Sequence, residues 1–157
     1  MNLKPYTHAL FRHIHEVTRW AESQPIECKR KVVGCSIVTL PHLLSPYEPE
    51  GGDLVEFVRA TNGPTPGHVC TGERGNCGCA HAEPRAVLTM MNMLNRQTKT
   101  ILCCNYSPCT RCAQVIIDAN SIAGLIDAVV YVRLTEHDVR GRDLLERAGL
   151  TVEQVCG

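Results

Sequence analysis

The sequence predicts an α/β domain in which helices cover a sheet. From about residue 82 onward, helical patterns alternate with short β-rich segments, which is typical of this class. The chain has 157 residues with 44% hydrophobic content, enough to bury one core. No internal repeat or low-complexity tract interrupts it. We therefore expect a single domain over residues 1–157.

The first half of the chain predicts one helix and two strands. Apolar residues recur at steps of four, four, three and four, as on one face of an amphipathic helix: Tyr6, Leu10, Ile14, Val17 and Ala21. Residues 32–40 and 54–60 are rich in strand formers. Residues 41–52, rich in Pro and Gly, should form the loop of a wide hairpin, and residues 61–78 should be irregular.

The second half predicts a regular alternation. In chain order we expect a helix over 82–95, a strand over 100–105, a helix over 109–121, a strand over 128–133, a helix over 142–148 closed by Gly149, and a strand over 152–155.

Composition restricts the partners. Sixteen basic and sixteen acidic side chains cancel, and aromatic residues make up 4% of the chain. Binding to a nucleic-acid strand favours basic grooves and stacking rings, so no nucleic-acid polymer is expected as a partner. Residues 1–16 lack the apolar core of a secretory signal, and no stretch has the length of a membrane span. Ten cysteines without an export signal indicate thiols and metal ligands in the cytoplasm.

Two short motifs predict a catalytic zinc site. His81, Cys109 and Cys112 supply one imidazole and two thiolates, which leaves a coordination position open for water. Glu83 would take the proton of that water and pass it on as a catalytic acid and base. Pro84 requires the helix that bears Glu83 to begin close to His81.

The second motif should also lie at the tip of a helix. Ser107 and Pro108 predict an N-cap followed by proline at the first helical position. Cys109 and Cys112 would then share one face of the opening turn, where the helix dipole favours thiolates. Two other interpretations remain open: the two cysteines as a redox pair, and Glu83 as a fourth ligand of a purely structural zinc.

The pairing of H-x-E with P-C-x-x-C is the signature of zinc-dependent nucleobase deaminases. The chain resembles the deoxycytidylate deaminase family of the cytidine and deoxycytidylate deaminase superfamily along most of its length. Besides the two motifs, four segments carry the resemblance: residues 27–34 (ECKRKVVG), 61–67 (TNGPTPG), 129–131 (VVY) and 144–150 (LLERAGL).

The resemblance implies a three-layer α/β/α fold with a five-stranded mixed sheet. It also implies hydrolysis of dCMP to dUMP and ammonia for thymidylate synthesis, with zinc-bound water as the nucleophile and Glu83 as the proton shuttle. Asn62, Ala82 and Ser107 are expected to contact the nucleotide. Many members form hexamers or trimers and respond to dCTP and dTTP, and a nucleotide effector would bring Mg²⁺.

Two departures from the family pattern concern the substrate. After the catalytic Glu the family usually carries one residue and then Asn, where this chain has Pro84 and Arg85. A tyrosine that the family tends to carry after Tyr131 is absent, and Leu134 and Thr135 stand there. Arg85 would grip a phosphate or point to solvent, and Arg30 and Lys31 are further candidates for a phosphate contact.

Alternative functions therefore stay open. The chain could deaminate another or modified base, such as a free nucleoside, 5-substituted dCMP, adenosine in tRNA or cytosine in single-stranded DNA. It could also be a non-catalytic module that zinc stabilises.

Four further cysteines predict a second, structural zinc: Cys28, Cys70, Cys77 and Cys79. Some family members hold such a zinc with cysteines that resemble Cys28 and Cys70, and His68 could replace one ligand. The remaining cysteines are interpreted as core residues (Cys35, Cys103, Cys104) and a free thiol (Cys156). His8, His13 and His15 are expected to be solvated or satisfied locally.

Overall fold

The computed structural model describes residues 1–40, 53–73, 76–93, 99–135 and 139–156. A five-stranded sheet forms its centre, in the spatial order β2-β1-β5-β6-β7. These strands are β1 (Gly34–Thr39), β2 (Val55–Thr61), β5 (Ile101–Tyr106), β6 (Ala128–Arg133) and β7 (Thr151–Gln154).

The strand directions make the sheet mixed. β1 is antiparallel to both β2 and β5, whereas β5, β6 and β7 run parallel. Parallel neighbours require a crossover, which α3 (Thr110–Ala123) and α4 (Arg140–Arg147) supply. The five-stranded mixed sheet that the family resemblance implied is therefore confirmed.

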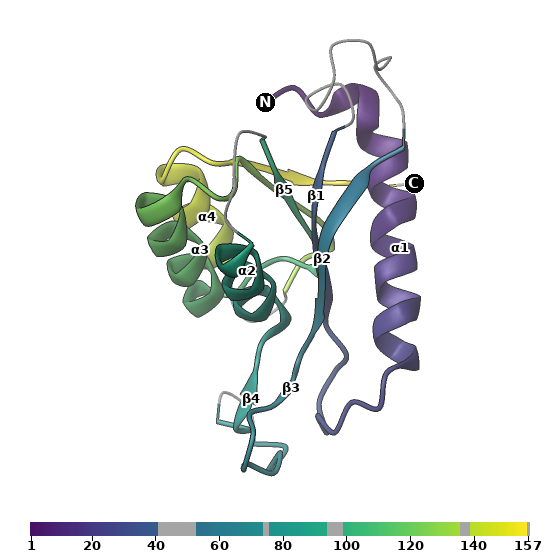
Figure 1. Cartoon of the computed structure of the whole chain (residues 1–157), viewed down its shortest axis with the longest axis vertical. Coiled ribbons are helices and arrows are strands. Elements are labelled where there is room, and N and C mark those ends of the chain that lie inside the picture. Colours follow the sequence, from purple (N-terminus) through teal and green to yellow (C-terminus); the bar gives the residue numbers. More distant parts are fainter. Residues whose placement is uncertain (41–52, 74–75, 94–98, 136–138, 157) are drawn as a thin grey trace.

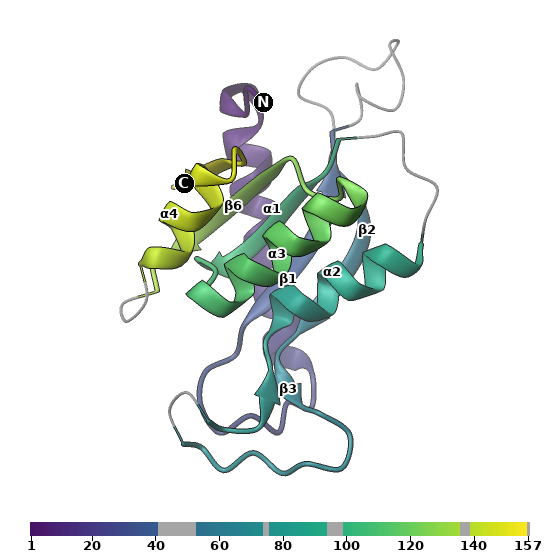
Figure 2. The same cartoon turned by 90° about the vertical axis from the view of Figure 1, so that its left-hand side faces the viewer.

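Helices cover both faces of the sheet. α1 (Thr7–Ser23), preceded by the short 3-10 helix η1 (Lys4–Tyr6), lies on one face, and α2 (Ala82–Asn92), α3 and α4 lie on the other (Figure 1). Figure 2 shows the latter three side by side over the strands. None of the helices in the described ranges is long and apolar enough to cross a bilayer.

The core has one apolar cluster on each face of the sheet. The helical stripe predicted for α1 is confirmed, because Leu10, Ile14, Val17 and Ala21 are all buried. Cys35 and Cys104 belong to the cluster under α2 and α3, while Cys103 points to the α1 side. All three are fully buried, as expected of small apolar side chains.

The segment predicted to be irregular, residues 61–78, contains one strand of a second, two-stranded sheet, and the other strand follows directly after it. β2 extends to Thr61, and β3 (Gly63–Pro64) pairs antiparallel with β4 (Cys79–Ala80). Strands of two residues carry no alternation of polarity, so the sequence pattern could not reveal them. This small sheet leads directly into α2 and lies at its N-terminal end (Figures 1 and 2).

The other differences concern element ends. α4 begins at Arg140, two residues before its predicted start, and α3 begins at Thr110. α2 ends at Asn92, and the end predicted for it at residue 95 lies outside the described residues. The loop predicted over 41–52 also lies outside them.

Gly141 allows α4 to approach the segment before α3. A Cβ at this position would lie 2.8 Å from the carbonyl carbon and 2.9 Å from the carbonyl oxygen of Cys109, and it would also meet the carbonyl oxygen of Pro108. Backbone atoms cannot rotate away as a flexible side chain can. α4 can therefore pack here only through a glycine.

We expect Gly141→Ala to destabilise the protein by about 1–3 kcal/mol, as overpacking of a tight contact does. The measurement is urea unfolding followed by circular dichroism. Arg147→Ala, at an exposed position of the same helix, serves as the control and should change stability by less than about 0.5 kcal/mol. Equal stability of wild type and Gly141→Ala would show that α4 can shift without cost.

Candidate metal centre and active site

His81, Cys109 and Cys112 bring three ligand atoms together at the tips of two helices. His81 Nδ1 lies 3.2 Å from Cys112 Sγ and 3.6 Å from Cys109 Sγ, and the two sulfurs are 3.5 Å apart. In tetrahedral coordination, bonds of roughly 2.3 Å to sulfur and 2.0 Å to nitrogen would separate the ligand atoms by roughly 3.5–3.8 Å. The three atoms thus fit a zinc ion, with one position left for water.

The backbone at both helix starts presents these ligands. His81 is the N-cap of α2 and Cys109 is the N-cap of α3, both with extended backbone conformation. Cys112 follows in the first turn of α3, where the helix begins at Thr110. The prediction that His81 stands at the start of its helix is confirmed. The prediction that Ser107 caps the next helix is wrong by two residues.

Ser107 is held by the chain beyond β6 instead of capping α3. Its backbone N–H donates to the carbonyl of Arg133 at 2.8 Å. The backbone N–H of Thr135 donates to Ser107 Oγ at 2.8 Å, and the Thr135 hydroxyl donates to the Ser107 carbonyl at 2.6 Å. These bonds tie the segment before Cys109 to the end of β6.

Glu83 lies beside the three ligand atoms and is 3% exposed. Its Oε2 is buried and has no hydrogen-bond partner within the described part of the chain. Burial raises the pKa of Glu83, because the charged carboxylate loses hydration. The carboxylate does not belong to the ligand group formed by His81 and the two cysteines, which favours a proton carrier over a fourth ligand.

The charges of the ligands suit a cation. The hydrogen bond between the two sulfurs, assisted by His81, lowers the pKa of Cys109 to about 4. The same hydrogen bond and burial raise the pKa of Cys112. The opposite shifts of the two pKa values favour a thiolate at Cys109, and a zinc ion would displace the proton of the second thiol.

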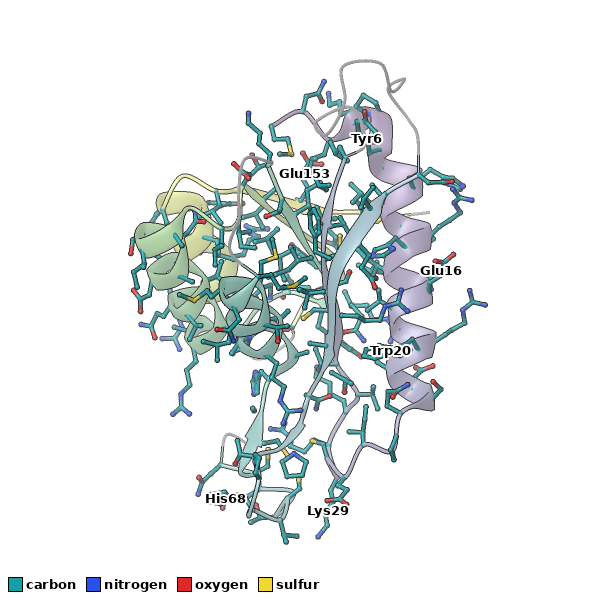
Figure 3. All side chains as sticks on the ribbon, viewed as in Figure 1. Tyr6, Glu16, Trp20, Lys29, His68 and Glu153 are labelled. Carbon is teal, nitrogen blue, oxygen red and sulfur yellow. The ribbon has the colours of Figure 1, made fainter. Side chains whose placement is uncertain are left out.

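A second candidate metal site consists of four cysteine sulfurs. The Sγ atoms of four cysteines all lie within 4.8 Å of one another: Cys28, Cys70, Cys77 and Cys79. Figure 3 shows sulfur atoms between the labelled Lys29 and His68. The backbone N–H of Lys29 donates to Cys70 Sγ at 3.3 Å and lowers the pKa of that thiol to about 7. His68 is exposed and is not part of the group.

A cavity of about 310 Å³ joins the two groups of ligands. Its wall contains His81 and Cys112 of the first group and Cys77 and Cys79 of the second. The other residues that line it are Arg30, Asn76, Gly78, Pro84, Arg111 and Val115. None of these described lining residues is an aspartate or a glutamate, so its fixed charge is positive.

Arg111 is a candidate that sequence reasoning missed. It occupies the first turn of α3 between the two ligand cysteines, and both it and Arg30 are exposed at the cavity. Among the described residues, neither guanidinium takes part in an ion pair. The sequence did contain a signal for Arg111, namely its place within the P-C-x-x-C motif. A residue between two proposed metal ligands in the first turn of a helix must lie close to the metal site.

Arg30, which the sequence offered as a phosphate contact, lines this cavity, whereas the other residues predicted to bind substrate do not. Asn62 is buried, with Oδ1 accepting from the Val33 N–H at 2.7 Å and Nδ2 donating to the Lys31 carbonyl at 2.9 Å. Ala82 is buried at the first position of α2. Lys31 lies over the Tyr106 ring, with its Nζ 3.8 Å from the ring centroid.

Arg85 does not line the cavity, and its guanidinium contacts backbone carbonyls of the segment after β2. Its guanidinium donates to the carbonyls of Gly63 at 3.0 Å and Pro64 at 2.8 Å, and more weakly to that of Thr61 at 3.4 Å. The contact that the sequence suggested for Arg85, a substrate phosphate, thus competes with three backbone carbonyls.

Comparisons with known proteins agree with this geometry. Residues 7–132 match the family described as the cytidine and deoxycytidylate deaminase zinc-binding region. No curated protein sequence matches the chain.

Solved structures that share the fold include the following three. The dCMP deaminase of the cyanophage S-TIM5 is similar in its apo form, with 22% identity, a TM-score of 0.62 and coverage of 99% of this chain and 100% of that one. Its complex with dCMP and dUMP gives 22% identity, a TM-score of 0.66 and 99% coverage of both chains. The Rib2 deaminase of Aspergillus oryzae, in complex with DARIPP, gives 17% identity, a TM-score of 0.63 and coverage of 95% and 85%.

Proposed function

The chain belongs to the cytidine and deoxycytidylate deaminase family, and from this premise we propose that it hydrolyses dCMP to dUMP and ammonia. The observation that carries the proposal is Glu83, a buried carboxylate with an unpartnered oxygen beside a three-ligand site that fits zinc. A structural site would close its fourth position with a protein ligand, whereas this one leaves room for water. The S-TIM5 neighbour binds dCMP and dUMP, which favours the same substrate here.

The chain's own groups would divide the reaction between them. His81, Cys109 and Cys112 would hold the zinc ion, which lowers the pKa of water toward about 7 in open sites of this kind. Glu83 would take a proton from the attacking water and deliver it to N3 of the cytosine ring. It would carry the second proton to the 4-amino group, so that the C4–N bond breaks and ammonia leaves.

The surroundings of Glu83 suit this task. Because burial raises its pKa, the carboxyl can hold a proton between the two transfers. Its position two residues after His81, in the first turn of α2, keeps it next to the ligand atoms.

The cavity supports a nucleotide over a nucleoside. Arg30 and Arg111 place two guanidinium groups at a wall that also contains His81 and Cys112. Guanidinium groups bind phosphate oxygens through charge-assisted hydrogen bonds. We therefore assign the 5′-phosphate of the substrate to this pair. The effectors dCTP and dTTP, their Mg²⁺ and assembly into hexamers or trimers remain predictions from the family resemblance.

We also propose that the second group of cysteines holds a structural zinc. Four sulfurs within 4.8 Å of one another match a closed tetrahedral site, and three of the cysteines come from the long segment between β2 and α2. Cys28 comes from the segment before β1, so the ion would link two parts of the chain that lie far apart in sequence.

Glu83→Gln should lower deamination of dCMP by about 10²–10⁴-fold, since general acid and base catalysis contributes this much. Ammonia release by the zinc-loaded protein is the measurement, with zinc content determined on the same samples. Zinc content should stay at the wild-type value, because Glu83 is not placed as a ligand. Full activity of the variant would exclude Glu83 as the proton carrier, and loss of zinc would make it a ligand.

Arg111→Gln and Arg30→Gln should each raise KM for dCMP by about 10–100-fold, because each removes charge-assisted hydrogen bonds worth about 1.5–3 kcal/mol. Steady-state kinetics with dCMP and with deoxycytidine check this, and Arg19→Gln on the opposite face is the control. KM for deoxycytidine should not change. Equal effects on nucleotide and nucleoside would contradict the assignment of the phosphate to these residues.

The zinc-loaded protein should contain two zinc ions per chain, as measured by elemental analysis. Cys70→Ser should reduce this to one, because a serine hydroxyl is a poor ligand for a site built from thiolates. Cys156→Ser, at an exposed free thiol, is the matched control and should keep both ions. A single ion in the wild type that survives Cys70→Ser would show that the four thiols hold no metal.

A further inference from the structure

Arg85 makes contacts that neither the reaction nor the metal sites require. It lies in the first turns of α2, two residues after Glu83, and is half-buried. Its guanidinium donates to the carbonyls of Pro64 at 2.8 Å, Gly63 at 3.0 Å and Thr61 at 3.4 Å. Within the described residues it has no carboxylate partner. All the hydrogen bonds described for this permanently charged side chain thus go to backbone carbonyl oxygens.

These carbonyls lie on both sides of Asn62, the residue that the family resemblance expects to contact the nucleotide. Asn62 is already fixed from one direction: its N–H donates to the Val33 carbonyl at 3.1 Å, and its side-chain amide bonds to the backbone of Lys31 and Val33. Arg85 holds the same short stretch of chain from the side of α2. Asn62 is therefore clamped between the segment before β1 and the catalytic helix.

Two sets of contacts join the Asn62 segment to the start of α2: the β3–β4 pairing and the hydrogen bonds of Arg85. Gly63 pairs with Ala80 and Pro64 with Cys79 in the small sheet, and Ala80 leads directly to His81 and α2. Arg85, four residues after His81, donates hydrogen bonds to the carbonyls of Gly63 and Pro64, the two residues of β3. The ladder and the guanidinium together set the distance between the Asn62 segment and the helix that bears Glu83.

We propose that Arg85 is a positioning residue, which holds Asn62 in register with Glu83 and the metal ligands by binding the carbonyls of Thr61, Gly63 and Pro64. The proposal rests on the proposed function in that Asn62 is taken as a substrate contact. Arg85 does not touch the phosphate, since its N–H groups are directed at the three carbonyls.

The geometry explains why arginine serves here. Three carbonyl oxygens from one short stretch of chain can be bound together only by a group with several N–H donors in a fixed arrangement. A guanidinium carries five N–H groups in one plane. A lysine ammonium has a single centre and would satisfy part of the set, while a glutamine amide has only two N–H groups and no charge. Arg85→Lys and Arg85→Gln thus form a graded series.

We expect Arg85→Gln to raise KM about tenfold for both dCMP and deoxycytidine, and to change kcat by less than about threefold. Arg85→Lys should raise KM by less than Arg85→Gln does, because the ammonium can still donate to part of the carbonyl set. Amide hydrogen exchange of residues 61–64, followed by mass spectrometry, should become faster in Arg85→Gln, whereas zinc content should remain at the wild-type value. Arg19→Gln should change none of these quantities.

Three outcomes would overturn the proposal. A rise in KM confined to dCMP would make Arg85 a phosphate ligand. A lower melting temperature with unchanged KM would make its role structural only. Unchanged hydrogen exchange at residues 61–64 would show that the carbonyl contacts do not order the segment. If the wild type deaminates no cytosine compound, the proposed function fails, and the exchange measurement alone decides the role of Arg85.

Discussion

The three atoms that we propose as zinc ligands must meet within the reach of one ion, and this constraint governs the packing around them. His81 comes from the start of α2 and the two sulfurs from the start of α3, so both helix tips must be located to within a few tenths of an ångström. Helix tips are not rigid by themselves, since their first N–H groups lack partners inside the helix. Each tip is therefore held from outside.

The two tips are held by different means. The tip of α3 is fixed from the C-terminal side of the chain, where Thr135 bonds twice to Ser107 and where Gly141 lets α4 pack on the backbone of Cys109. The tip of α2 is fixed from the N-terminal side, by the β3–β4 ladder and by Arg85. The metal centre thus depends on segments far apart in sequence, which the central sheet brings together.

Sequence reasoning predicted the fold class, the five central strands and the ligand triad, because periodicity and metal-ligand spacing are local properties. It failed where long-range contacts decide the outcome. The hydroxyl of Ser107 looked available for α3, but Thr135, twenty-eight residues away, occupies it. For Arg85 the sequence left a phosphate and solvent open, and it could not reveal the backbone carbonyls that the guanidinium contacts, two of which belong to a two-residue strand without any sequence signal.

The β3–β4 segment also connects the two candidate metal sites. Only Ala80 separates Cys79 of the second group from His81 of the first, and both residues line one cavity. The stretch from β3 to β4 contains little regular structure, so its conformational entropy opposes a fixed cavity wall. A cross-link at Cys28, Cys70, Cys77 and Cys79 would remove most of that freedom, as closure of a long loop by a metal does. Under the proposed second zinc, the four cysteines would replace the packing that a larger hydrophobic core would provide, and their effect would reach His81 through Ala80 alone.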